Sequence, residues 1–250
     1  MLKLLDSLQQ LAVSGDTPFG CKIRSAAAAY GVEKRIAQFW SQEGGTALAK
    51  LDDSAILEEG GQTDWEELAA FLPALDLQCF SCTESAARKM NLPVSSRGEI
   101  MLLHPAGDSE KAAADLETNP SLRDIYELLD RVRTDTFAPP EFEPFYMDLS
   151  YRIRRGNAFS VGIRREGRLI ACALCSAMTE RSAILSGVAC APELRRHGFS
   201  GSAVRGILSI LKKQNVYIFR AEGENEEFYR KLGFQPYGSW AEMKRAPEKR

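Results

Sequence analysis

The chain has 250 residues, of which 44% are hydrophobic and 26% are charged, a mixture typical of a globular protein. Its formal net charge of -2 argues against a general nucleic-acid-binding surface. No apolar run approaches the ~20 residues of a membrane helix, and MLKLLDSLQQ at the start has polar residues where a signal peptide would be apolar. We therefore expect one large or two modest domains in the cytoplasm, with no membrane or nucleic-acid partner.

The first half predicts a hairpin, a helix, a strand and a second helix, in that order. Residues 37–57 alternate as hairpin strands that end in SAIL. Residues 63–75 read as a helix, with Thr63 and Glu66 as a capping box. Residues 76–82 then read as a strand and residues 83–90 as a helix.

The second half begins with a connection and continues as strands and helices. Residues 107–120 are acidic, rich in alanine and closed by a proline, and we read them as a connection or a loop. A helix follows, then a hairpin around Arg-Glu-Gly, a third strand, a helix, a strand and a last helix. Their ranges are 121–132, 158–178, 181–190, 200–213, 215–221 and 224–234. This order predicts an α/β or α+β protein built on a mixed sheet.

The two halves share an order of motifs. Both hairpin regions end in SAIL, the helix and strand of 65–82 match those of 202–221, and 84–92 matches 225–234. One match could arise by chance, but three in the same order favour an internal duplication. We therefore predict two related domains, 1–106 and 107–250. The first copy lacks a glycine-rich joint and has Ala87 where the second has Tyr229.

Four of the six cysteines form two pairs with CxxC spacing, Cys79 with Cys82 and Cys172 with Cys175. A zinc site made from both pairs is conceivable. Both pairs lie in apolar, strand-like runs, where an offset of three residues turns the side chains to opposite faces. We prefer reduced cysteines that serve as small buried hydrophobic residues, and we expect no metal.

The stretch ELRRHGFSGSAV, residues 193–204, joins the third strand to a helix and holds basic residues, glycines and serines. A helix N-terminus exposes unpaired N–H groups and a partial positive charge, and glycine lets an anion approach the backbone. The stretch therefore predicts either a phosphate site or a tight turn with a solvated basic edge. It is neither a P-loop nor a Rossmann fingerprint.

The same stretch resembles the acetyl-CoA motif of the GNAT acetyltransferase superfamily. Arg195 and Gly198 fit that motif, whereas Ser200 stands at a position that usually holds Gly or Ala. About thirty residues on, NEEFYRKLGF resembles the family's second signature, Tyr-x-x-x-Gly-Phe after a helix. The resemblance covers roughly residues 115 to 245. It implies two tandem GNAT-like halves with a twisted mixed sheet and helices on both faces, the first half being degenerate.

The resemblance also implies a site. The backbone of Val188, Ala189 and Cys190 would pair with the pantetheine arm of acetyl-CoA as an added strand does. Backbone amides of residues 196–201 would hold the pyrophosphate, with Asn225 as a further cofactor contact. The expected cofactor-binding set is Val188, Ala189, Cys190, Arg195, Arg196, His197, Gly198, Phe199, Ser200, Gly201 and Asn225.

Tyr229 is the expected catalytic residue, a general acid for the departing CoA thiolate. The alternative is a packing aromatic between Phe228 and Phe234. Asn225 lies four residues earlier, so we expect the two to share a helix face. A general base is harder to find, because Ile184 stands about where some members have a glutamate. Glu180 is a weak candidate, water relays are the alternative, and we read His197 as part of the phosphate turn and His104 as structural.

The resulting hypothesis is an N-acetyltransferase that uses acetyl-CoA as cosubstrate to acetylate a primary amine, on a small molecule or a peptide, by direct attack. The alternative is an acyl-CoA-binding sensor or scaffold without catalysis. The sequence leaves open the acceptor, the base, the oligomeric state (a homodimer included) and any role of the first half in the acceptor site.

Overall fold

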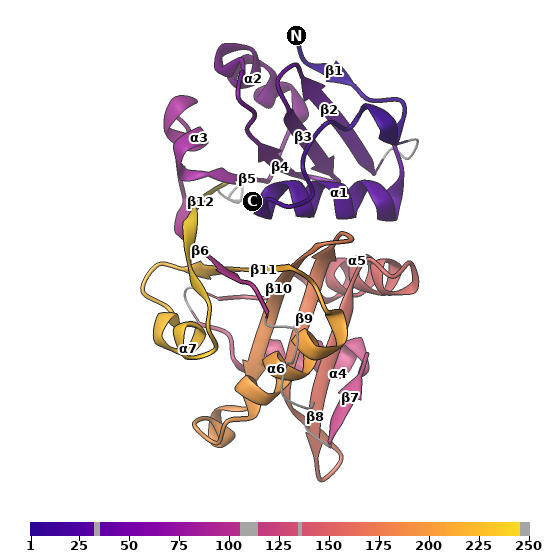
Figure 1. Cartoon of the computed structure of the whole chain (residues 1–250), viewed down its shortest axis with the longest axis vertical. Coiled ribbons are helices and arrows are strands. Elements are labelled where there is room, and N and C mark those ends of the chain that lie inside the picture. Colours follow the sequence, from indigo (N-terminus) through magenta and orange to yellow (C-terminus); the bar gives the residue numbers. More distant parts are fainter. Residues whose placement is uncertain (33–35, 106–114, 135–136, 246–250) are drawn as a thin grey trace, which may run out of the picture. The chain divides into compact units, whose positions relative to one another are not determined.

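The structure, a computed structural model, describes residues 1–32, 36–105, 115–134 and 137–245 (Figure 1). The chain divides into two compact units. The first unit holds Met1–Met101, Phe219–Glu224 and Pro236–Arg250, and the second holds Leu102–Ile218 and Asn225–Gln235. The predicted domain boundary after residue 106 stays a prediction, and the division into units adds that two late segments of the chain pack with its first hundred residues.

The first unit is a mixed sheet in the order β1-β2-β3-β4-β5-β12-β6. Its strands are β1 Lys3–Leu4, β2 Ala37–Gln42, β3 Thr46–Leu51, β4 Ser54–Glu58, β5 Cys79–Thr83, β6 Ser96–Leu103 and β12 Gln235–Lys244. Its helices are η1 Leu8–Gln10, α1 Pro18–Tyr30, α2 Trp65–Phe71, η2 Leu72–Leu75 and α3 Glu84–Lys89. β4 and β5 run parallel, and β12, the last strand of the chain, pairs antiparallel with β5.

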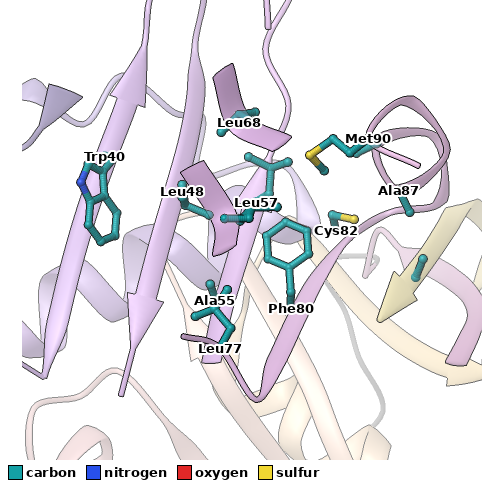
Figure 2. Packing of buried hydrophobic residues seen from close by; sticks show 13 residues of the cluster. Trp40, Leu48, Ala55, Leu57, Leu68, Leu77, Phe80, Cys82, Ala87 and Met90 are labelled. Atoms are coloured by element: carbon teal, nitrogen blue, oxygen red, sulfur yellow. The ribbon is translucent and has the colours of Figure 1, made fainter. Parts of the chain in front are cut away.

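Helices cover both faces of the first unit's sheet. On one face Leu48, Leu57 and Phe80 pack with Leu68 of α2 and Met90, which follows α3 (Figure 2). On the other face the apolar side chains of α1 pack against alternate residues of β2 and β3, so the two cores use opposite sides of the same strands. The predicted mixed sheet with helices on both faces is confirmed.

The second unit repeats this plan in the order β7-β8-β9-β10-β11. Its strands are β7 Leu116–Thr118, β8 Phe159–Arg165, β9 Arg168–Met178, β10 Ser182–Cys190 and β11 Asn215–Ala221. Its helices are α4 Leu122–Arg131, α5 Phe142–Arg154, η3 Pro192–Leu194, α6 Phe199–Leu211 and α7 Glu226–Lys231. The serine of each SAIL motif begins a strand, Ser54 for β4 and Ser182 for β10. Each of these strands runs parallel to the next strand in the chain, β5 and β11, respectively.

Some expectations for local structure are wrong. The helix predicted from residue 63 is capped by Asp64, whose carboxylate accepts the Glu67 N–H at 2.9 Å, so Thr63 makes no capping box. The Thr63 hydroxyl instead lies 2.7 Å from that of Thr46 and contacts Gly60. In the predicted connection, residues 106–114 lie outside the described residues, and Leu116–Thr118 pair with β8 as a strand. The sequence analysis also missed α1, α5, β6 and β12.

Candidate active site

β10 carries a bulge just before the residues expected to pair with pantetheine. Ser186 lies opposite Leu174 and Ala189 opposite Cys172, so β10 has one residue more than β9 over this interval. Gly187 adopts φ +50°, a left-handed conformation that glycine tolerates. The glycine inside a strand pattern was the signal that could have predicted the bulge.

Just before this bulge, β10 parts from its parallel neighbour β11. β10 and β11 pair from Ser182 with Asn215 to Leu185 with Ile218, and their register ends there. Val188, Ala189 and Cys190 therefore lie past the last pair on the β11 side, while β9 still pairs with Ala189 and Cys190 on the other side. A strand whose edge is open in this way can accept an extended ligand through its backbone groups.

The turn after β10 opens α6 with unsatisfied backbone donors. Gly198 is the N-cap with φ +85°, and Arg196 also has a left-handed φ of +65°. The first intrahelical bond runs from the Ser202 N–H to the Gly198 carbonyl at 2.9 Å. Among the described residues, the N–H groups of 196–201 donate to no protein acceptor. These donors gather at the positive end of a thirteen-residue helix.

The surroundings of this turn favour an anion. Arg195, Arg196 and His197 are exposed, and a side chain built on Gly198 would meet nothing within 4 Å. A backbone hydrogen bond and the ion pair with Arg131, at 2.8 Å, lower the pKa of the nearby Glu193 carboxylate. The Arg205 guanidinium lies along the first turn, 3.4 Å from where a Cβ of Gly201 would be. The sequence analysis missed Arg205, although it follows Gly201 by one helical turn.

Two further members of the predicted set fix the turn to the strand. The Cys190 thiol lies 3.5 Å from the Leu194 carbonyl. Burial raises the pKa of this thiol, and a hydrogen bond with Ser200 opposes the effect. The His197 ring bonds the Arg195 carbonyl at 2.9 Å and stacks near Phe199, with 6.4 Å between ring centroids. Ser200 and His197 therefore have local contacts that order the turn.

Tyr229 lies on α7 and is almost fully buried, with 7% of its surface exposed. Its ring packs edge-on against Phe228 at 4.9 Å and Phe234 at 5.7 Å between centroids. Burial raises the pKa of the phenol above its usual value, so the group is protonated at neutral pH. A protonated phenol is the form that a general acid requires.

The other residues considered for the site lie at separate places in the second unit and do not form one group with Tyr229. Asn225 is the exposed N-cap of α7, with φ +55°. It precedes the helix, so the expectation that it shares a helix face with Tyr229 is wrong. Glu180 is exposed in the turn before β10, and its carbonyl accepts a bond from Lys213 at 3.2 Å. Ile184 is buried within β10, and His104 is exposed and bonded to the Gln214 carbonyl.

The cysteines lie in strands. Cys79 and Cys82 are on β5, and Cys172 and Cys175 are on β9. No disulfide joins any of the six cysteines, and burial raises the pKa of Cys79, Cys82 and Cys172 to about 12. In the parts of the chain that the structure describes, no three His, Cys, Asp or Glu side chains gather as metal ligands would.

The site therefore combines a splayed parallel strand pair, a bulged strand and a helix whose first N–H groups donate to no acceptor among the described residues. Residues 122–234 match the family model described as acetyltransferase (GNAT) family. This stretch of the chain belongs to the GNAT family. A search of curated protein sequences found no match.

Solved structures show the same fold over most of the chain. A GCN5-related N-acetyltransferase from Kribbella flavida has a TM-score of 0.58 and 18% identity, covering 90% of this chain and 95% of its own. A tandem GNAT protein from the clavulanic acid biosynthesis pathway has a TM-score of 0.59 and 15% identity, with 100% of both chains covered. A GCN5-related N-acetyltransferase from Sphaerobacter thermophilus has a TM-score of 0.56 and 12% identity, covering 89% and 84%. The two halves therefore have the tandem GNAT fold.

None of the helices among the described residues is both long enough and apolar enough to cross a lipid bilayer.

Proposed function

We propose that the second unit transfers the acetyl group of acetyl-CoA to a primary amine. The observation that carries this proposal is the unpaired donor set of residues 196–201, beside the open edge of Val188–Cys190. These groups fit a pyrophosphate and an extended pantetheine arm, respectively. Acetyl-CoA would supply a thioester whose carbonyl carbon is open to attack.

The reaction needs one new bond, one broken bond and two proton movements. The amine nitrogen forms a bond to the carbonyl carbon, the C–S bond breaks with its electron pair going to sulfur, and the nitrogen loses a proton. We assign Tyr229 to give the sulfur its proton as general acid. Burial raises the pKa of this phenol, so the group holds its proton at neutral pH, although the same shift makes it a weaker acid than an exposed tyrosine. With Ile184 in place of a glutamate, we assign no side-chain base and expect water to take the amine proton.

The proposal includes three further expectations: that the acceptor is an amine on a small molecule or a peptide, that the protein acts in the cytoplasm, and that it can form a homodimer. A screen of primary amines for thiol release from acetyl-CoA tests the acceptor class. Tyr229→Phe keeps the ring between Phe228 and Phe234 and removes only the hydroxyl. We expect acetyl-CoA affinity to be unchanged and kcat and kcat/KM to fall together by roughly 10²–10⁴-fold.

Tyr217→Phe is the matched control, because it removes another buried phenol hydroxyl from the same unit. Its turnover should stay close to wild type once its melting temperature is shown to be similar. Unchanged turnover in Tyr229→Phe would remove the tyrosine from the mechanism. Acetyl-CoA binding without turnover on any amine would favour the second candidate, a binding module, which Ser200 and the missing glutamate motivate. No acetyl-CoA binding at millimolar concentration would overturn both.

A further inference from the structure

The first unit contains a cavity of about 320 Å³, a space equal to about ten water molecules. Residues of the first unit alone line it, from α1, β4, β5, α3, β6 and β12. Its apolar wall includes Phe19, Ile100 and Tyr237, and its acidic side holds Glu58 and Glu59. A concave, mostly apolar space with a few placed polar groups is the usual form of a small-molecule site.

The cavity lies where the first unit's parallel strands part. β4 and β5 pair from Ser54 with Cys79 to Ile56 with Ser81, and Glu58 and Thr83 lie two residues beyond that last pair. β10 and β11 of the second unit part in the same way after Leu185. The first unit has therefore kept the splay of the fold, with a space at the place where the strands separate.

The chemistry of this space differs from that of the second unit. The helix that follows β4 is capped by the Asp64 carboxylate, and Glu66 and Glu67 occupy its first turn. These groups satisfy the helix start and surround it with negative charge, so it does not suit a phosphate. A pyrophosphate-bearing ligand has no anion site here, and the strand ends present carboxylates instead.

Of the two glutamates, Glu59 already has partners that compensate its negative charge. Its carboxylate accepts the Thr83 hydroxyl at 2.7 Å and the Lys89 ammonium at 3.2 Å. Arg88, the other charged residue of the lining, lies 4.0 Å from the carboxylate of Glu84. On α1, burial lowers the pKa of Lys22 to about 8, and the charge of Glu242 raises it. Within the described residues, Glu58 therefore has no ion-pair partner.

Glu58 is half-buried and is destabilised as a carboxylate. Burial raises its pKa to about 7, the Thr17 hydroxyl and the Gly20 N–H act in the opposite direction, and the charge of Glu59 raises it. A cation in the cavity would offset the cost of burying this charge.

The apolar wall suits the carbon part of such a cation. Phe19, 1% exposed and held edge-on by Phe219 at 5.3 Å between centroids, and Ile100, 2% exposed, form the packed base of this wall. The same pair of rings already accepts an ammonium, because Lys22 Nζ lies 3.5 Å from the Phe219 centroid. Tyr237 is 47% exposed and forms the more open side.

We propose that this cavity is a binding site for a small organic amine, with its ammonium against Glu58 and its apolar part against Tyr237, the exposed member of the wall that also contains Phe19 and Ile100. The site is made only of first-unit residues, and the proposal does not depend on acetyl transfer by the second unit. It gives the first half of the chain a ligand of its own.

The test uses the full chain without acetyl-CoA and 2-phenylethylamine as the probe. All three tryptophans, Trp40, Trp65 and Trp240, belong to the first unit, so their fluorescence reports on that unit alone. We expect saturable binding at pH 8, at least tenfold tighter than that of 2-phenylethanol, which lacks the charge. Because Glu58 has a pKa of about 7, binding at pH 6 should be roughly tenfold weaker.

Glu58→Gln should weaken binding at pH 8 by at least tenfold. Glu66→Gln is the matched control, because it removes a carboxylate from the exposed side of α2 in the same unit and outside the cavity. It should bind as the wild type does. The proposal is wrong if the amine shows no saturation up to about 10 mM, if the neutral alcohol binds equally well, or if the Glu58→Gln protein, shown to be folded, keeps full affinity.

Discussion

The charge of Glu58 makes the stability of the first unit depend on pH in a direction that can be worked out. Its pKa is about 7 in the folded protein and 4.5 without the fold, so the folded state holds this proton more tightly. Below pH 4.5 both states are protonated and Glu58 has no differential effect on stability. As the pH rises from 4.5 through 7, the unfolded state gives up its proton first, and stability falls.

The size of the effect follows from the difference of 7 minus 4.5, or 2.5 pKa units. At 1.36 kcal/mol per unit this is about 3.4 kcal/mol as an upper bound. Glu58 is only partly buried, and solvent reaches the site, so we discount the value to about 1–2 kcal/mol. Glu58→Gln removes the titration and should therefore be more stable than wild type at pH 8, but not at pH 4.

The assay is urea unfolding followed by tryptophan fluorescence, which isolates the first unit because all three tryptophans lie there. The free energy of unfolding is measured at pH 4 and pH 8 for the wild type, Glu58→Gln and the control Glu66→Gln. The difference between Glu58→Gln and wild type should grow by about 1–2 kcal/mol between the two pH values, while that of the control stays flat. If the Glu58→Gln difference is also flat, the carboxyl is not desolvated and the electrostatic argument for the amine site loses its basis.

Two other predictions concern the second unit and the thiols. Gly198 has φ +85°, which both Asn and Asp tolerate, so Gly198→Asp and Gly198→Asn differ mainly in charge. If residues 196–201 bind the pyrophosphate, calorimetry should show at least tenfold weaker acetyl-CoA binding for the Asp variant than for the Asn variant, and equal affinities would contradict the anion site. Burial raises the pKa of Cys79, Cys82 and Cys172 to about 12, so these thiols should react slowly with Ellman's reagent in the native protein at pH 8 and rapidly after unfolding. Fast labelling of all six in the native state would refute the burial.

The elements that the sequence predicted well are those whose signal is local. β11 begins and ends at the predicted residues, 215 and 221, because a short continuous apolar run lies between two polar turn segments. β10 is placed by its SAIL start and stopped by Pro192. The same order of motifs in both halves of the chain also predicted the tandem architecture, and both SAIL motifs begin strands as that prediction requires.

The missed elements depend on contacts that no local pattern carries. α5 contains Pro144 and follows Pro139 and Pro140, so its sequence reads as a break, yet Phe145 and Leu149 are buried and stabilise it. β12 pairs with a strand more than 150 residues earlier. The Glu58 cavity gathers side chains from six elements, so its charge and shape exist only once the sheet has formed.

The position of the cap on α2 shows a finer limit. Thr63 and Glu66 have the right spacing for a capping box, but Asp64 is adjacent and equally able to cap. The Thr63 hydroxyl is used by Thr46 and Gly60, which come from β3 and the turn after β4. The choice between two neighbouring caps was therefore made by tertiary contacts.

The pairing of β12 with β5 has a consequence for the synthesis of the chain. Trp240 lies opposite Thr83 and Lys244 opposite Cys79, so this edge of the first unit stays without its partner strand until translation has passed residue 244. During nearly all of synthesis β5 presents open backbone donors and acceptors, which are prone to pair with other chains. A ribosome that stops immediately before residue 235 would release a product whose first unit lacks β12, while its second unit lacks only Gln235. The nascent first unit therefore has to be protected, or to wait, until the last strand emerges.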